Sequence, residues 1–303
     1  VSIPNQQQFI MAVSLTVEDV IERLGGFGRY QLRLFSISGF AYFVIGAVIL
    51  QQVAVERAPQ TKCVVPAANC TVCALNDTFV GSLVDFSTAA SSFELVCGRS
   101  ILRGWLGSIF FVGFGMGSTA AGYMADTYGR RKALIFVHGT LCCGALTFLA
   151  PSYPVYFVTR LVAGIGCGGG IVVGFVLIME FLPNNHRGWM GGFGMNGLWS
   201  SGGVVMGLVA ALVHHIFSSP REYQPEWEEW RYISMSAWIL SLAALVAASY
   251  APESPRWLLA QGRHMAAWAV LESVANANGV PMPQGELCPT AGGEKQDAAE
   301  GEE

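Results

Sequence analysis

The stretch GYMADTYGRRK, residues 122–132, decides the fold of this chain because it sets four charged residues between two long uncharged runs. The first run covers residues 104–125, and the second begins at Ala133. Each run is long enough for a membrane-spanning helix, which needs about 20 mostly apolar residues. We therefore predict a tight, charged turn at one face of a bilayer, joining two spanning helices.

The composition of the whole chain agrees with a membrane protein. Its 303 residues are 52% hydrophobic and only 13% charged, whereas an average soluble domain carries about 25% charged residues. The 36 glycines suit membrane helices, which use small residues for close packing. The net charge of −4 and the lack of a basic patch argue against a nucleic-acid partner.

Uncharged runs of membrane length predict an all-α polytopic membrane protein with six transmembrane helices. The run from residue 133 to 159 is divided at Pro151 and Pro154, because proline ends a helix and restricts the residue before it. The third helix should therefore end near Ala150 and the fourth should begin near Val155. The six runs are residues 34–55, 104–125, 133–150, 155–179, 188–220 and 232–252.

Basic residues predict the orientation, because short cytoplasmic loops are enriched in Lys and Arg. Both termini are predicted to be cytoplasmic, on the side of Arg130, Arg131 and Lys132. The predicted segments are a cytoplasmic N-terminal segment (1–33), the first transmembrane helix (34–55), an extracellular loop (56–103), helices two to six (104–250), a cytoplasmic helical segment (251–283) and a disordered acidic tail (284–303).

The predicted extracellular loop contains both N-x-[ST] sequons of the chain, at Asn69 and Asn76. Glycans are added in the secretory lumen, which is also oxidising, so we predict glycosylation and two disulfides with three possible pairings. Alternatively, Cys70 and Cys73 form a redox or zinc pair, although the loop has no histidine or second pair to complete it. The four loop cysteines are Cys63, Cys70, Cys73 and Cys97.

Several segments resemble motifs of the major facilitator superfamily. GYMADTYGRRK is similar to the signature G-x-x-x-D-R-x-G-R-R/K, with Thr127 where an arginine is usual. With the Cys-rich loop, the set resembles the organic cation/anion/carnitine transporter family over residues 16–283, and this implies the N-terminal half of a two-half fold. The other segments are SSFELVCGRS (91–100), TRLVAGIGCGGG (159–170), MEFLPNNHRG (179–188) and APESPRWLLAQGR (251–263).

The resemblance implies a latch at the cytoplasmic gate, made of ion pairs that break when the two halves rock. Alternatively, the bases snorkel and only set the topology, and Glu253 and Arg256 cap a short interfacial helix at 264–275. The candidate gate residues are Gly122, Asp126, Gly129, Arg130, Arg131, Glu180, Arg187, Glu253 and Arg256.

Arg160 is predicted to lie inside the bilayer, where an ionisable side chain is costly and is a functional candidate by default. We place it in the substrate or coupling pathway; the alternative is a buried anchor that donates to backbone carbonyls. Phe40, Trp199 and Phe193 could hold a cation against their rings, or they are ordinary packing residues.

Glycine patterns predict close helix contacts rather than nucleotide binding. Residues 164–169 match G-x-G-x-x-G, but they lie in a predicted membrane helix and not after a strand. Pairs four residues apart instead predict faces where backbones approach closely. These pairs are 113/117, 164/168, 166/170, 170/174, 188/192 and 203/207. The sequence shows no Ser-His-Asp, zinc or Walker arrangement, so we predict no enzyme activity, no metal and no cofactor.

Together these features predict a plasma-membrane carrier of small organic ions, namely cations, anions or carnitine-like zwitterions. It would work by alternating access within the lipid bilayer, completed by a C-terminal six-helix half or by a second copy of the chain. One alternative is a sugar-porter-like carrier, and another is a non-transporting membrane glycoprotein with the same fold. The sequence leaves the charge of the substrate and the coupling mechanism open.

Overall fold

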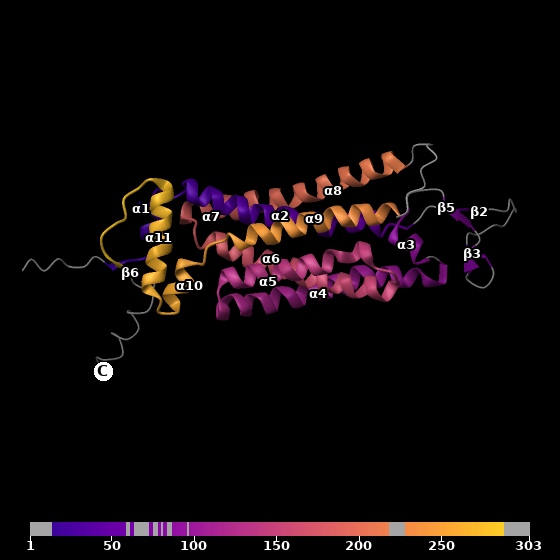
Figure 1. The fold of residues 1–303 in the computed structure, drawn as a ribbon, viewed down its shortest axis with the longest axis horizontal. Helices are drawn as coiled ribbons and strands as arrows, with labels where there is room; N and C mark the ends of the chain where they lie inside the picture. The colour runs from indigo at the N-terminus through magenta and orange to yellow at the C-terminus, as the bar shows by residue number, and fades with distance from the viewer. Residues whose placement is uncertain are drawn as a thin grey trace, which may run out of the picture.

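The fold is a bundle of long helices with a small helical unit at one end (Figure 1). The computed structural model describes residues 14–58, 61–63, 73–74, 78–79, 81–83, 87–95, 97–217 and 228–287. Helix α11 marks one end of the bundle and helix α3 the other, and we call these the α11 end and the α3 end.

Six helices of the described chain are long and apolar enough to cross a membrane, which confirms the predicted fold class. Most begin a few residues before the predicted runs, because charged and polar residues form their first turns. In α6 the first turn instead contains Pro154, whose fixed φ suits the start of a helix. The spans are α2 (Arg29–Val55), α4 (Ser100–Tyr128), α5 (Arg130–Gly144) with a 3-10 turn (Ala145–Leu149), α6 (Tyr153–Met179), α7 (Asn184–Trp189) continuing through a π turn (Met190–Gly194) into α8 (Met195–Phe217), and α9 (Glu229–Ser249).

Glycines bring α4 and α6 into close contact, as predicted for the pairs 113/117 and 164/168. A Cβ atom on Gly113 or Gly117 would collide with the α6 backbone, and one on Gly164 or Gly168 would collide with the α4 backbone. The prediction is wrong for residues 188 and 192, where a Cβ would meet no described atom within 4 Å. Those two glycines lie on an exposed side of α7 and the π turn.

The α11 end carries a unit built from both ends of the described chain (Figure 1). It contains α1 (Val17–Arg23), α10 (Pro255–Ala260) and α11 (His264–Asn278), and strand β1 (Ser14–Leu15) pairs in parallel with β6 (Glu286–Leu287). Apolar residues of α1 share one buried core with residues of α10, α11 and the adjoining ends of the spanning helices. The sequence predicted only a helix at 264–275, and Gly279, at φ +70°, ends it three residues later than expected.

The α3 end carries α3 (Ala89–Ser92), a 3-10 turn (Cys97–Arg99) and two short antiparallel ladders. Strand β2 (Thr61–Cys63) pairs with β5 (Gly81–Leu83), and β3 (Cys73–Ala74) pairs with β4 (Thr78–Phe79). Cys63, Cys73 and Cys97 are described by their backbone only. Asn69, Cys70 and Asn76 lie outside the described residues, so the sequons and disulfides stay predictions.

Candidate functional site

The charged turn between α4 and α5 lies at the α11 end, where Arg130 joins three helices. Its Nη1 donates to Asp126 Oδ1 on α4 at 2.6 Å, and its Nη2 donates to Glu180 Oε1 at the end of α6 at 3.1 Å. Arg130 and Glu180 side chains are each 12% exposed, whereas Asp126 is 74% exposed. The pair with Glu180 is therefore the stronger one, because solvent screens exposed pairs.

Glu253, from the loop after α9, caps the N-terminus of α5. Its Oε1 accepts from the backbone N–H groups of Arg130 at 2.7 Å and of Arg131 at 3.2 Å. The first N–H groups of a helix have no partner inside the helix and carry a partial positive charge, so a carboxylate there is favourable. Glu253 thus acts on α5 through the backbone and not through an arginine side chain.

Two further side chains close the exposed ends of neighbouring helices. Trp257 Nε1 donates to the carbonyl oxygen of Asp126 at 2.7 Å, at the end of α4. Arg131 Nη2 donates to the carbonyl oxygen of Ser249 at 2.9 Å, at the end of α9. The last carbonyls of a helix lack partners inside it, so these contacts fix the end of α4 to α10 and the start of α5 to the end of α9.

Glu18 of α1 is a member of this network that sequence reasoning missed. Its Oε1 lies 2.6 Å from Arg256 Nη2 and 4.0 Å from Arg187 Nη2. The pKa of Arg256 is lowered, chiefly because its side chain is buried. The charge of Glu18 opposes this shift, and the charge of Arg187 adds to it. Glu18 therefore separates two arginines that would otherwise repel each other. Its signal in the sequence is the capping box formed by Thr16 and Asp19, which predicts a helix start beside it.

Arg187 also closes the end of α6. Its Nε donates to the carbonyl oxygens of Met179 at 3.2 Å and Leu182 at 3.0 Å, and its Nη1 donates to Asn184 Oδ1. The structure thus brings together eight of the nine candidate gate residues. The exception is Gly122, which lies two turns back along α4 with no described atom within 4 Å of its would-be Cβ. Thr127, where an arginine is usual, only donates to the carbonyl oxygen of Tyr123.

Gly129 makes the turn possible, and its replacement by alanine is expected to destabilise the α11 end by about 1–3 kcal/mol. Its φ is +106°, and a Cβ would collide with Glu253 Oε2. Gly122→Ala is the matched control, since that position is helical and open. Thermal unfolding of both variants in nanodiscs checks this. Equal unfolding temperatures would contradict the role of Gly129.

A second buried charge cluster lies near the α3 end, around Arg160 of α6. Arg160 is 2% exposed, and its Nε lies 2.8 Å from Glu56 Oε1, at the end of α2. The hydroxyl of Tyr156 donates to the same oxygen at 3.1 Å, and the guanidinium carbon lies 5.1 Å from the centre of the Phe110 ring. The partner of Arg160 is therefore a carboxylate that the sequence did not single out.

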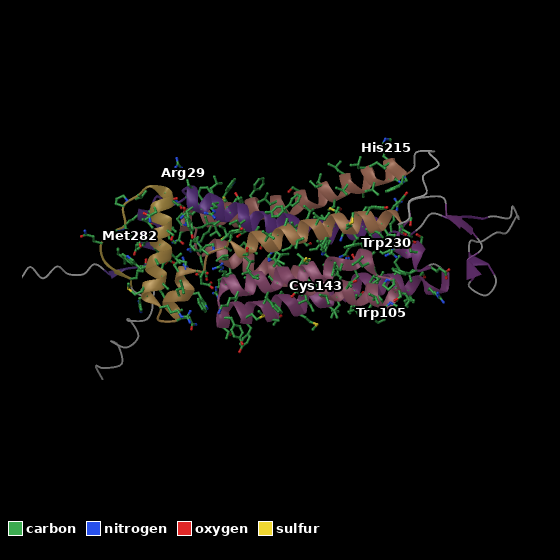
Figure 2. All side chains as sticks on the ribbon, in the orientation of Figure 1. Arg29, Trp105, Cys143, His215, Trp230 and Met282 are labelled. Carbon is green, nitrogen blue, oxygen red and sulfur yellow. The ribbon has the colours of Figure 1, made fainter. Side chains whose placement is uncertain are left out.

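The aromatic residues proposed for the substrate pathway do not gather around Arg160. Phe40 lies in the half of α2 near the α11 end and stacks on Phe43. Trp199 of α8 packs its backbone against Gly46 of α2, and Phe193 is exposed and stacks on Trp189. Figure 2 marks the two ends: Arg29 and Met282 lie at the α11 end, and Trp230 and His215 at the α3 end. The pathway roles of these residues stay predictions.

The six spans and the way they pack are those of the major facilitator superfamily fold. Residues 32–290 match the profile of the "Sugar (and other) transporter" family, and the chain belongs to that family. Among solved structures, the proton:xylose symporter XylE aligns with a TM-score of 0.58 over 81% of this chain and 50% of that chain. At 19% sequence identity, this likeness shows the fold alone.

Curated relatives include one that is named as an organic cation/carnitine transporter. Solute carrier family 22 member 7 of Rattus norvegicus is 30% identical over 202 residues, covering 66% of this chain and 35% of that protein. Organic cation/carnitine transporter 4 of Arabidopsis thaliana is 27% identical over 283 residues, covering 89% of this chain and 50% of that protein. Synaptic vesicle glycoprotein 2B of Mus musculus is 27% identical over 272 residues, covering 86% and 34%. The chain thus spans a third to a half of the relatives it matches.

Proposed function

We propose that the chain is the N-terminal six-helix unit of a carrier of small organic ions that works by alternating access. The observation that carries the proposal is the network around Arg130, which ties the ends of α4, α5 and α6 to the loop after α9. Charge-assisted hydrogen bonds at the edge of the bundle can be exchanged for water when the helix ends separate. Such a latch can open without disrupting the apolar core.

The cargo class is inferred from the relatives. The relative with the greatest coverage of this chain among those described above is named for organic cations and carnitine, and the solute carrier family 22 relatives point in the same direction. We assign the protein to the plasma membrane, with the α11 end on the cytoplasmic side because of its basic residues. Glycosylation at Asn69 and Asn76 and disulfides among the loop cysteines belong to the same proposal.

A second six-helix unit would complete the carrier, either from further sequence or from a second copy. Helices α4 and α8 are the least buried of the six spans. Their exposed faces include large apolar residues, such as Val112 and Met116 on α4 and Val204 and Leu208 on α8. These faces could pack against that unit, with the substrate between the two.

Uptake by cells that express the gene encoding this chain tests the cargo class. Labelled tetraethylammonium, carnitine, p-aminohippurate and xylose would be compared, with surface expression measured in the same cells. Saturable uptake of at least one organic ion is expected. An Arg130→Ala variant at equal surface level should lose that uptake. Absence of saturable organic-ion uptake, with the protein at the surface, would contradict the proposal.

Two alternatives have their own supporting observation. The likeness to XylE keeps a sugar carrier open, and saturable xylose uptake alone would favour it. Another relative is named as a synaptic vesicle glycoprotein rather than for a transported solute. A chain that reaches the surface and takes up none of the four solutes would favour a membrane glycoprotein of this fold.

A further inference from the structure

We propose that a groove between α2 and α9 at the α11 end binds one anionic glycerophospholipid. The α2–α9 groove is lined by Tyr30, Arg33, Ile37, Phe40, Ala247 and Tyr250. Its helices contact each other along the bundle, and the groove opens where α2 begins and α9 ends. None of the residues that line this groove belongs to the Arg130 network.

The groove has a polar part and an apolar part in series. A small pocket of about 80 Å³ lies at the helix ends between Tyr30, Arg33, Tyr250 and Pro252. A larger, open trough of about 410 Å³ continues past Ile37 and includes Phe40 and Ala247. Arg33, Ile37 and Tyr250 line both parts. A phospholipid has the same order, with a charged head followed by apolar chains.

The charge of the polar part favours a phosphate-containing anion. Arg33 is exposed and forms no ion pair within the part of the chain that the structure describes, so its guanidinium is available for bidentate phosphate binding. None of the residues that line the groove is acidic. Nearby, Arg131 donates to the carbonyl oxygen of Ser249, the residue before Tyr250. Two bases therefore flank the end of α9.

The dimensions of the groove match a lipid at the boundary of the bilayer. Arg33 and Phe40 are seven residues apart on α2, or about 10 Å along the helix axis. Half of the hydrocarbon core is about 15 Å thick, so the trough can hold the first two thirds of an acyl chain. Tyr250 is 67% exposed and suits the interface, where amphipathic aromatic rings are enriched.

An anionic lipid is favoured over a zwitterionic one because the unpaired charge in the polar part is positive. Anionic phospholipids are concentrated in the cytoplasmic leaflet, where we place the α11 end. The assignment also gives Phe40 a role against an acyl chain instead of against a substrate cation.

Photo-crosslinking in nanodiscs tests the site with the 303-residue chain itself. Nanodiscs of phosphatidylcholine would contain a small fraction of either phosphatidylserine or phosphatidylcholine with a diazirine on one acyl chain. Labelled peptides would be mapped by mass spectrometry. We expect phosphatidylserine to label the α2 and α9 residues of the groove more than phosphatidylcholine does. Arg33→Gln should reduce that preference about fivefold, the effect of one base at a membrane surface, and Arg33→Lys should retain most of it.

Two variants separate this site from general lipid contact. Ala247→Trp fills the trough and should abolish groove labelling while leaving labelling elsewhere unchanged. Arg99→Gln, at the α3 end, is the matched control and should have no effect on the groove. The proposal is overturned if both lipids label the groove equally, if Arg33→Gln acts no more than Arg99→Gln, or if Ala247→Trp leaves the labelling intact. Unfolding temperatures of the variants verify that each is folded.

Discussion

Replacement of Glu56 by glutamine is expected to lower the free energy of unfolding by about 3–5 kcal/mol, because it leaves the charge of Arg160 buried without a counter-charge. Glutamine keeps the size of the side chain and can still accept a hydrogen bond from Tyr156, so the change isolates the charge. Arg160 is 2% exposed and Glu56 10% exposed, which keeps solvent from screening the loss. Unfolding in nanodiscs, followed by tryptophan fluorescence, measures it, since Trp230 packs against Tyr156.

Glu94→Gln is the matched control for this prediction. Glu94 pairs with Arg99 at 3.8 Å, but both side chains are mostly exposed, at 79% and 67%. Exposed pairs contribute about 0–1 kcal/mol, so this variant should unfold almost like the unchanged chain. The double variant Glu56→Gln/Arg160→Met should recover much of the lost stability, because it removes both charges. Equal effects of Glu56→Gln and Glu94→Gln would refute the buried pair.

Replacement of Arg130 by alanine is expected to open the α11 end, with hydrogen exchange in residues 126–134 and 253–259 faster by about 100-fold. Arg130 is the side chain through which Asp126 and Glu180 are joined. Its loss leaves Glu180 as a largely buried, unpaired carboxylate, at a cost of about 3 kcal/mol or more, and each 1.4 kcal/mol is a factor of ten in an equilibrium. Hydrogen–deuterium exchange with mass spectrometry gives the local change directly.

Two other variants serve as controls for this experiment. Lys132→Ala removes a neighbouring base that makes no ion pair with any residue the structure describes, and it should leave exchange nearly unchanged. Arg130→Lys keeps the charge but loses the planar fork that reaches two carboxylates, so its effect should be intermediate. If Arg130→Ala and Lys132→Ala increase exchange equally, the latch does not depend on Arg130 pairing.

Much of the fold could be predicted because the information was local. Each spanning helix is a continuous apolar run, and proline marks the boundary between the third and fourth. The glycines of α4 and α6 could be predicted to touch because spacing by four residues places them on one helix face. The same spacing at residues 188 and 192 failed, because spacing tells which face they share and not whether another helix covers it.

The candidate site was predictable only where residues lie in a motif. Asp126, Arg130, Glu180 and Glu253 come from segments with recognisable spacing, and the structure brings them together. Glu18 and Glu56 were missed because each meets its partner across more than 100 residues of sequence. A carboxylate at the end of an apolar run is ordinary in isolation, and only the packing of α2 against α6 gives Glu56 its arginine.

The parallel pairing of β1 with β6 has a consequence for biosynthesis. Ser14 and Leu15 leave the ribosome before any spanning helix, but their partners Glu286 and Leu287 are made after all six. The core that buries the apolar face of α1 is therefore complete only when α10 and α11 have been translated. Docking of α1 thus reports that the six described spans have been synthesised, and an undocked α1 is a feature by which quality control can recognise a chain that stops before α10.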